Sequence, residues 1–148
     1  MFKHILCPTD LTRRCYPALK KAIQFSHHFG SKITVLNCHP EFMNQDERQM
    51  LRVSTDDIKE TFRQTALEAR EKMQATMNKL EAGEAEIEYL LREGKPQKAI
   101  VEVAEKNGVD LVIIYTDGPD SIRDFVAGTI TEYVINRVSC PVLVIPPK

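Results

Sequence analysis

The sequence has little net charge of either sign. Its 148 residues include 20 basic and 21 acidic side chains, so the formal net charge at pH 7 is −1. Proteins that bind nucleic acid usually carry an excess of Lys and Arg that neutralises backbone phosphates. This sequence has neither that excess nor a dense Lys/Arg run. We therefore do not expect nucleic acid to be a partner.

Long hydrophobic stretches are also missing. No apolar run approaches the roughly 20 residues that span a bilayer. The opening MFKHIL reads as the start of a strand, without the apolar segment and cleavage site of a secretory signal. We therefore expect a cytoplasmic protein with no membrane partner.

Cysteine motifs are absent as well. Four cysteines occur, at positions 7, 15, 38 and 140, and none has the C-x-x-C spacing of a zinc or redox site. We interpret them as reduced thiols that fill the core as small apolar side chains. A metal or redox cluster of Cys7, Cys38 and His39 at the strand ends is an alternative, but it lacks the usual ligand spacing.

Short apolar runs alternate with amphipathic segments along the whole chain. The runs lie at 2–8, 32–38, 85–91, 109–115 and 142–146. The amphipathic segments lie near 18–29, 55–81, 97–107 and 129–138, and glycines follow the first and third of them. Strand–helix alternation predicts a single α/β domain over 1–148, with a parallel sheet and helices on its faces. The polar segment 39–54 is expected to be an irregular connection.

The segment 55–81 carries an apolar stripe close to heptad spacing. We expect this helix to pack on the sheet, with an oligomerising coiled coil as the alternative. The stripe consists of Ile58, Phe62, Ala66, Ala69, Met73, Met77 and Leu80.

Two loops follow predicted strands at the edge where α/β proteins bind ligands. The first is 8–12 (PTDLT) and the second is 115–121 (YTDGPDS), which leads to Gly128 and Thr129 at the start of the last helix. A helix start with a hydroxyl suits a phosphate. Gly-Thr is also an ordinary capped helix start, and Gly118-Pro119 an ordinary turn. Local sequence alone favours these ordinary interpretations.

Three longer segments add a family resemblance. ILCPTDLT, REGKPQKAIVEVAEKNGVDLVII and AGTITEYVINRVSCPVLVIPP resemble the universal stress protein family, and together they extend over essentially the whole chain. Nucleotide-binding members carry G-x2-G-x9-G-[ST] after the fourth strand, and Gly118, Gly128 and Thr129 match its later positions. The resemblance implies a three-layer α/β/α fold with a five-stranded Rossmann-like sheet of order 3-2-1-4-5.

The resemblance also implies an adenine nucleotide, ATP or AMP, between the first and fourth strands. Asp10 would hold the ribose or support a metal such as Mg²⁺ that bridges the phosphates. The other implied contacts are Pro8 and Thr9 against the base, Cys38 lining its pocket, Ile114 beside the sugar, and Gly118, Gly128, Thr129 and Ile130 around the phosphates.

The sequence departs from the motif at its first glycine, where it has Tyr115. A tyrosine adds a large side chain and restricts φ. Asp117 and Asp120 put negative charge near the phosphates, with Arg123 nearby to offset it. Either Tyr115 points away and the site binds ATP or AMP, or the site has lapsed and the chain is a dimeric interaction protein.

No residue stands out as a general base with an orienting partner, so no catalytic residue is predicted. Weak ATP hydrolysis is the most that the resemblance implies. The resemblance further implies a homodimer formed through the last strand, Pro141–Pro146, which would otherwise be an exposed apolar edge. Which stress signal, nucleotide or protein partner the chain recognises is not encoded in any feature that we find.

Overall fold

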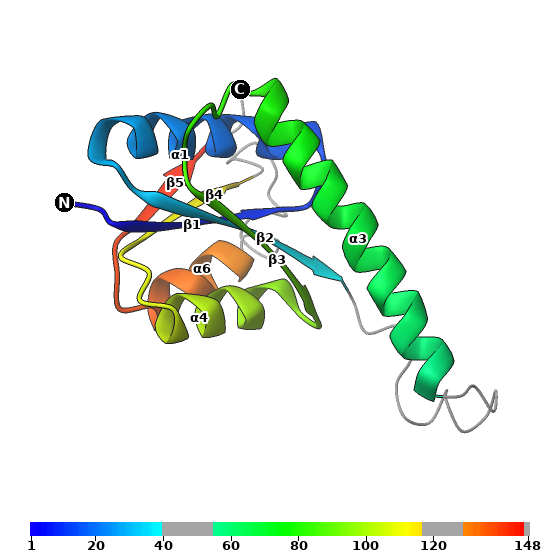
Figure 1. Cartoon of the computed structure of the whole chain (residues 1–148). Coiled ribbons are helices and arrows are strands. Elements are labelled where there is room, and N and C mark those ends of the chain that lie inside the picture. The colour runs from blue at the N-terminus through cyan, green and yellow to red at the C-terminus, as the bar shows by residue number, and fades with distance from the viewer. Residues whose placement is uncertain (40–54, 117–128, 147–148) are drawn as a thin grey trace.

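Five parallel strands form the centre of the fold (Figure 1). The computed structural model describes residues 1–39, 55–116 and 129–146, with the backbone alone at 55–58 and 129. The sheet has the order β3-β2-β1-β4-β5, and neighbouring strands are parallel throughout. The strands are β1 His4–Thr9, β2 Lys32–His39, β3 Ile87–Glu93, β4 Leu111–Tyr115 and β5 Val142–Ile145.

Each predicted strand and helix is present, with bounds shifted by a few residues. In the described residues the helices are α1 Tyr16–Phe29, α3 Thr55–Lys79, α4 Pro96–Lys106 and α6 Thr129–Arg137, and a 3₁₀ turn at Arg13–Cys15 precedes α1. The end of α1 follows from Gly30, whose φ of 70° places it in the left-handed region. Its backbone N–H donates to the Ser26 carbonyl at 2.8 Å and closes the helix.

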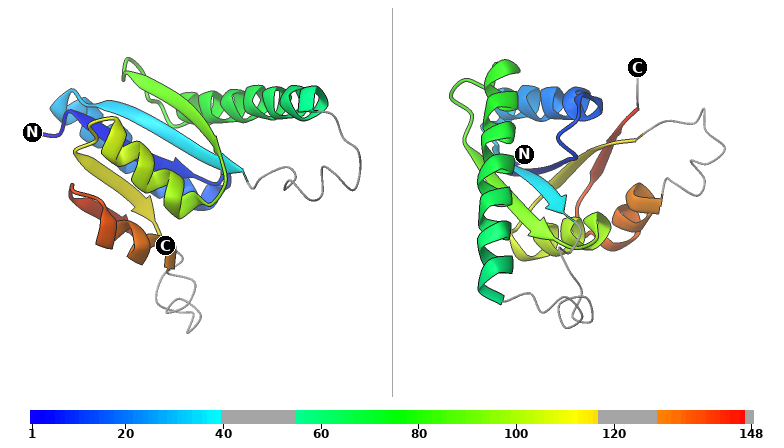
Figure 2. Two further views of the ribbon diagram at one scale, coloured as in Figure 1. Left: turned by 90° about the horizontal axis from the view of Figure 1, so that it is seen from below. Right: turned by 90° about the vertical axis from the view of Figure 1, so that its right-hand side faces the viewer.

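The helices cover the sheet in two layers, so the fold is three-layered (Figure 2). Helices α1 and α3 pack on one face with Ile5, Val35 and Ile113. Helices α4 and α6 pack on the other face with Leu6, Leu36 and Val112. The alternation of these strand residues between faces is the period of two that a strand imposes. The predicted three-layer α/β/α fold and the strand order 3-2-1-4-5 are both confirmed.

Only the second half of α3 lies on the sheet. Ala69, Met73 and Met77 are buried, whereas the first turns project beyond the strands (Figure 2). The helix has 25 residues, a length of about 37 Å, and β3 beside it has only 7 residues. The predicted packing on the sheet is confirmed for this second half.

The strand order places β1 beside β4 at the centre of the sheet. The chain leaves β1 toward α1 on one face and leaves β4 toward α6 on the other (Figure 1). This divergence creates the crevice in which open α/β sheets bind ligands. The expected irregular connection, except His39, and most of the second predicted loop lie outside the described residues. Among the residues described, no helix has the length and hydropathy needed to cross a membrane.

Candidate functional site

A constrained loop follows β1 at the centre of the carboxyl edge. Leu11 has a φ of 67°, a left-handed conformation that is rare for a branched side chain. Two local hydrogen bonds hold it there: the Leu11 N–H donates to Thr9 Oγ1 at 3.0 Å, and the Thr12 N–H donates to Asp10 Oδ1 at 2.9 Å. Strained backbone of this kind is concentrated at functional sites.

The Asp10 carboxylate accepts five hydrogen bonds. Oδ1 accepts from the Thr12 N–H at 2.9 Å, the Thr12 hydroxyl at 2.6 Å and the Cys15 thiol at 3.0 Å. Oδ2 accepts from the Tyr115 hydroxyl at 2.8 Å and from Arg14 at 3.2 Å. Partial burial opposes ionisation, but the bonds from Cys15, Thr12 and Tyr115 outweigh it and hold the Asp10 pKa well below its usual range. Asp10 is therefore a fixed anion at neutral pH.

Tyr115 reaches Asp10 from the neighbouring strand. It is the last residue of β4, and its ring packs against the core between the sheet and helices α1 and α3. Burial, together with the hydrogen bond that it donates to Asp10, raises the pKa of its hydroxyl. Tyr115 therefore points toward Asp10 and not away from it, and nucleotide binding itself stays a prediction. The side chain joins the ends of the two strands that flank the crevice.

Two buried cysteines, Cys7 and Cys15, lie close to Asp10. Cys15 accepts a hydrogen bond from the Asp10 N–H at 3.3 Å, and its thiol donates to Asp10 Oδ1. Burial, with that donated bond, raises the Cys15 pKa to about 12. Burial and the neighbouring Cys15 raise the pKa of Cys7 as well. Both groups are therefore protonated thiols at neutral pH and support the loop as apolar or weakly donating side chains.

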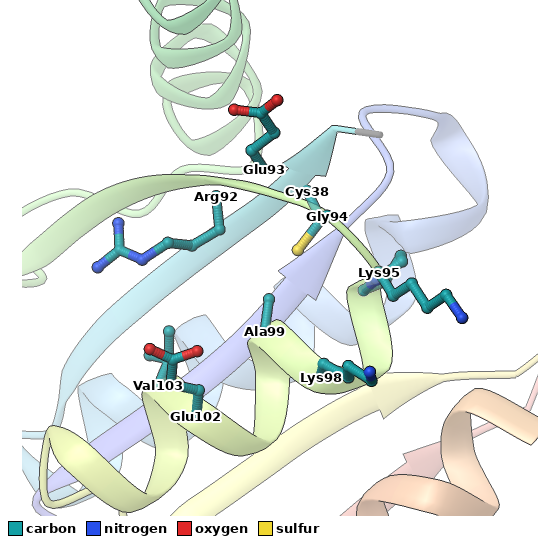
Figure 3. A pocket seen from close by; sticks show the side chains of 10 residues that line it. Cys38, Arg92, Glu93, Gly94, Lys95, Lys98, Ala99, Glu102 and Val103 are labelled. Atoms are coloured by element: carbon teal, nitrogen blue, oxygen red, sulfur yellow. The ribbon is translucent and has the colours of Figure 1, made fainter. Parts of the chain in front are cut away.

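A pocket of about 660 Å³ opens beside Cys38, between the ends of β2 and β3 and the start of α4 (Figure 3). The Cys38 thiol points toward Ala99 of α4, so this part of the wall is apolar (Figure 3). Lys95, which directly precedes α4, and Lys98, in its first turn, extend away from Cys38 (Figure 3). The pocket thus combines an apolar wall with a charged rim. Burial raises the Cys38 pKa to about 11, despite the opposing charge of Arg92, so this thiol is neutral.

Most of the predicted site residues that the structure describes lie at the carboxyl edge of the sheet. Thr9 is buried, and its carbonyl accepts a hydrogen bond from Asn37 Nδ2 at 3.0 Å. Pro8 and Thr9 pair in register with Leu36 and Asn37, so Cys38 follows directly beside them. Ile114 and Ile130 both pack in the cluster beneath α4 and α6.

The remaining predicted residues concern the phosphates. Thr129 is the first residue of α6, but its side chain is not described. Gly118 and Gly128 lie outside the described residues, as do Asp117, Asp120 and Arg123. The phosphate half of the predicted site therefore stays a prediction.

The alternative metal or redox cluster is not assembled. Cys7 packs on the α1/α3 side of the sheet and Cys38 on the α4 side. Within the part of the chain that the structure describes, no group of three or more His, Cys, Asp or Glu side chains could hold a metal ion.

Sequence reasoning missed the donors that surround Asp10. Thr12, Arg14 and Cys15 all come from its own loop. The Asp-x-Thr spacing was an available signal, because an Asp side chain commonly accepts from the N–H two residues later. No local pattern indicates the bond to Tyr115.

Comparisons with known proteins agree with this architecture. The family model described as the universal stress protein family matches residues 1–146. Universal stress protein MJ0577 of Methanocaldococcus jannaschii is 27% identical over 157 residues, which cover 100% of this chain and 97% of that protein. Universal stress protein Sll1388 of Synechocystis is 24% identical, with 95% and 96% covered.

Solved structures give the same result. The structure of MJ0577 superposes with a TM-score of 0.76 at 28% identity and covers 100% of this chain and 98% of that one. Universal stress protein UspA from Lactobacillus plantarum has a TM-score of 0.75 at 20% identity, with 97% of each chain covered. The second likeness shows the fold alone. The match of the family model over nearly the whole chain shows more: the chain belongs to the universal stress protein family.

Proposed function

We propose that this universal stress protein binds an adenine nucleotide at the carboxyl edge of its sheet and acts as a nucleotide-responsive module in a stress response. The observation that carries the proposal is the pocket beside Cys38. Its volume of about 660 Å³ lies within the range of roughly 300–1,000 Å³ typical of small-molecule sites.

The chemistry of the pocket suits a base and a charged tail. A purine is flat and largely apolar on its faces, so the wall of Cys38, Ala99 and Val103 is a suitable surface for it. In the pairing of β1 with β2, Thr9 lies opposite Asn37, the residue before Cys38, and Asp10 directly follows Thr9. We expect both residues to be within reach of the ribose. The start of α6 at Thr129 offers a helix N-terminus to a phosphate.

Two structural relatives carry related ligands. One solved universal stress protein is a complex with cAMP, with a TM-score of 0.68 to this chain. Another, from Archaeoglobus fulgidus, is a complex with dAMP, with a TM-score of 0.62. Both are 19% identical to this chain. Each of these ligands is an adenine nucleotide with a single phosphate, so AMP is the first ligand to test.

The test is native mass spectrometry of freshly purified protein, followed by calorimetric titration with AMP and ATP with and without Mg²⁺. We expect saturable binding and a rise in melting temperature that follows ligand concentration. Cys38→Phe should fill the apolar wall and weaken AMP at least tenfold, whereas Cys38→Ser keeps the volume and should bind AMP nearly as well as the native protein. No saturable binding of either nucleotide would refute the proposal.

A second function is favoured by the bond between Tyr115 and Asp10. If that bond permanently occupies the crevice, the chain is an interaction protein without a nucleotide. A protein that purifies empty and ignores both nucleotides would support this alternative.

A further inference from the structure

The Tyr115 side chain lies at the crevice between the ends of β1 and β4, where open α/β sheets bind ligands. Strands β1 and β4 are neighbours, paired at Ile5 with Leu111 and at Leu6 with Val112. Asp10 directly follows β1, and Tyr115 ends β4. The Tyr115 hydroxyl donates to Asp10 Oδ2 at 2.8 Å, although the two residues are 105 positions apart in sequence. We call this hydrogen bond the Tyr115–Asp10 contact.

The carboxylate of Asp10 has no acceptor position to spare. An ionised carboxylate offers about four lone-pair sites, and Asp10 already accepts from five donors. A ribose hydroxyl or a metal ion can bind Asp10 only if it displaces one of them. The donors on Oδ1, Thr12 and Cys15, belong to the same loop and are fixed with it.

Oδ2 is therefore the oxygen that a ligand can reach. Its two donors are Arg14 and Tyr115. The Arg14 side chain is 61% exposed, and the Asp10 side chain is 33% exposed. Tyr115 is half-buried, packs in the core and approaches from the β4 side of the crevice. In the crevice between β1 and β4, where open α/β sheets bind ligands, Tyr115 is thus the donor that reaches Oδ2 from outside the loop of Asp10.

We infer that Tyr115 is an internal competitor of the nucleotide: its hydroxyl occupies on Asp10 the place of a ribose hydroxyl, and binding requires the Tyr115–Asp10 contact to break. This inference rests on the proposed function. It deepens that function because it identifies the residue that sets the affinity of the site. It also predicts that AMP binds without Mg²⁺, since Asp10 has no oxygen free for a metal ion.

The test is the affinity of Tyr115→Phe for AMP, measured by calorimetry with and without Mg²⁺. Phenylalanine keeps the packed ring and removes only the competing hydroxyl. A hydrogen bond to a charged group is among the stronger ones, but Asp10 is partly exposed, so we expect AMP to bind about five- to tenfold more tightly. Tyr115→Gly removes the ring as well and should bind at least as tightly as Tyr115→Phe.

Tyr89→Phe is the matched control. Tyr89 is a half-buried tyrosine of β3 that packs on the same face of the sheet, and its substitution should leave the affinity for AMP unchanged. Thermal melting of each variant checks that it is folded, and Tyr115→Phe alone decides the result if the glycine variant does not fold.

The outcomes separate the inference from the proposed function. If the native protein and Tyr115→Phe bind AMP equally, or the variant binds more weakly, the inference is wrong and the proposed function stands. Dependence of native AMP binding on Mg²⁺ would also overturn it. If the native protein purifies without a nucleotide and binds AMP weakly, whereas Tyr115→Phe binds it about five- to tenfold more tightly, the inference is supported. If no variant binds any adenine nucleotide, both are refuted.

Discussion

Replacing Asp10 with alanine should destabilise the fold by a modest and calculable amount. The change removes the acceptor of five hydrogen bonds. Thr12 and Arg14 are exposed, so their donor groups bond to water when Asp10 is removed, and the loss of their bonds to Asp10 costs little. Cys15 is buried and Tyr115 half-buried, and these two donors lose a partner that water does not fully replace. At about 1 kcal/mol for each bond, reduced by partial exposure, we expect a loss of about 1–2 kcal/mol.

Urea unfolding followed by circular dichroism measures this loss at one fixed protein concentration. The dependence of the unfolding free energy on urea concentration should not change, and the urea concentration at the midpoint of unfolding should fall by roughly 0.5–1 M. Glu60→Ala is the control: Glu60 and Arg63 form an exposed ion pair at 3.7 Å, with side chains 69% and 74% exposed. Its removal should change the free energy of unfolding by less than about 0.5 kcal/mol. A loss for Asp10→Ala no larger than that of the control would refute the reasoning.

The same variant has a predicted pH dependence. The Asp10 pKa is lower in the folded protein than in the unfolded chain, whose carboxyl has a pKa of about 3.9. The folded state therefore gains stability from the ionised group above that pH and loses it as the pH falls. The gap in unfolding free energy between the native protein and Asp10→Ala should be full at pH 6 and should narrow below about pH 4. A gap that is constant with pH would show that charge does not strengthen these bonds.

Two further predictions concern α3 and β5. The Met77 side chain is 1% exposed and fills the core beneath α3, so Met77→Ala should lower the free energy of unfolding by about 2–5 kcal/mol. Leu67 lies on the same helix and is 51% exposed, so Leu67→Ala should lower it by less than about 0.5 kcal/mol in the same urea assay. We also propose that β5, a half-buried edge strand, pairs with its copy across a two-fold axis. The Pro141 carbonyl accepts from the Val112 N–H of β4, and the Ile145 carbonyl accepts from the N–H of Thr116, which follows β4. The alternate Val144 N–H therefore points outward. Val144→Pro should give a monomer by light scattering, and a native protein that is monomeric at micromolar concentration would contradict the proposal.

Local patterns sufficed to predict the strands and helices. The run 109–115 contains only one charged residue, Asp110, and its continuous apolar side chains indicate a strand that is covered on both faces. Gly30 predicted the end of the first helix because a left-handed residue is needed there. The apolar stripe over 55–81 also predicted the long helix α3 correctly. Sequence could not show that only its second half meets the sheet, because that depends on the length of β3 beside it.

The candidate site was predictable only in part, because its contacts join distant segments. Asp10 and Cys38 were identified at strand ends, and the strand order that makes them neighbours came from the family resemblance. The Tyr115–Asp10 contact depends on that order and also on a rotamer that no spacing predicts. The basic side chains around the pocket, Arg92 and Lys95, are brought to Cys38 by the pairing of β2 with β3. Periodicity identifies such elements without saying which of them are adjacent.

The strength of the Tyr115–Asp10 contact bears on whether the site has lapsed. If the contact contributes about 1 kcal/mol, the state in which Asp10 is free has a population of roughly 15%. The apparent affinity for a ligand that needs Asp10 released from Tyr115 then falls about six- to sevenfold, which is a weakening and not a loss. Tyr115 alone is therefore too weak a competitor to abolish binding. A site that is truly empty must therefore have lost contacts other than those that Tyr115 blocks.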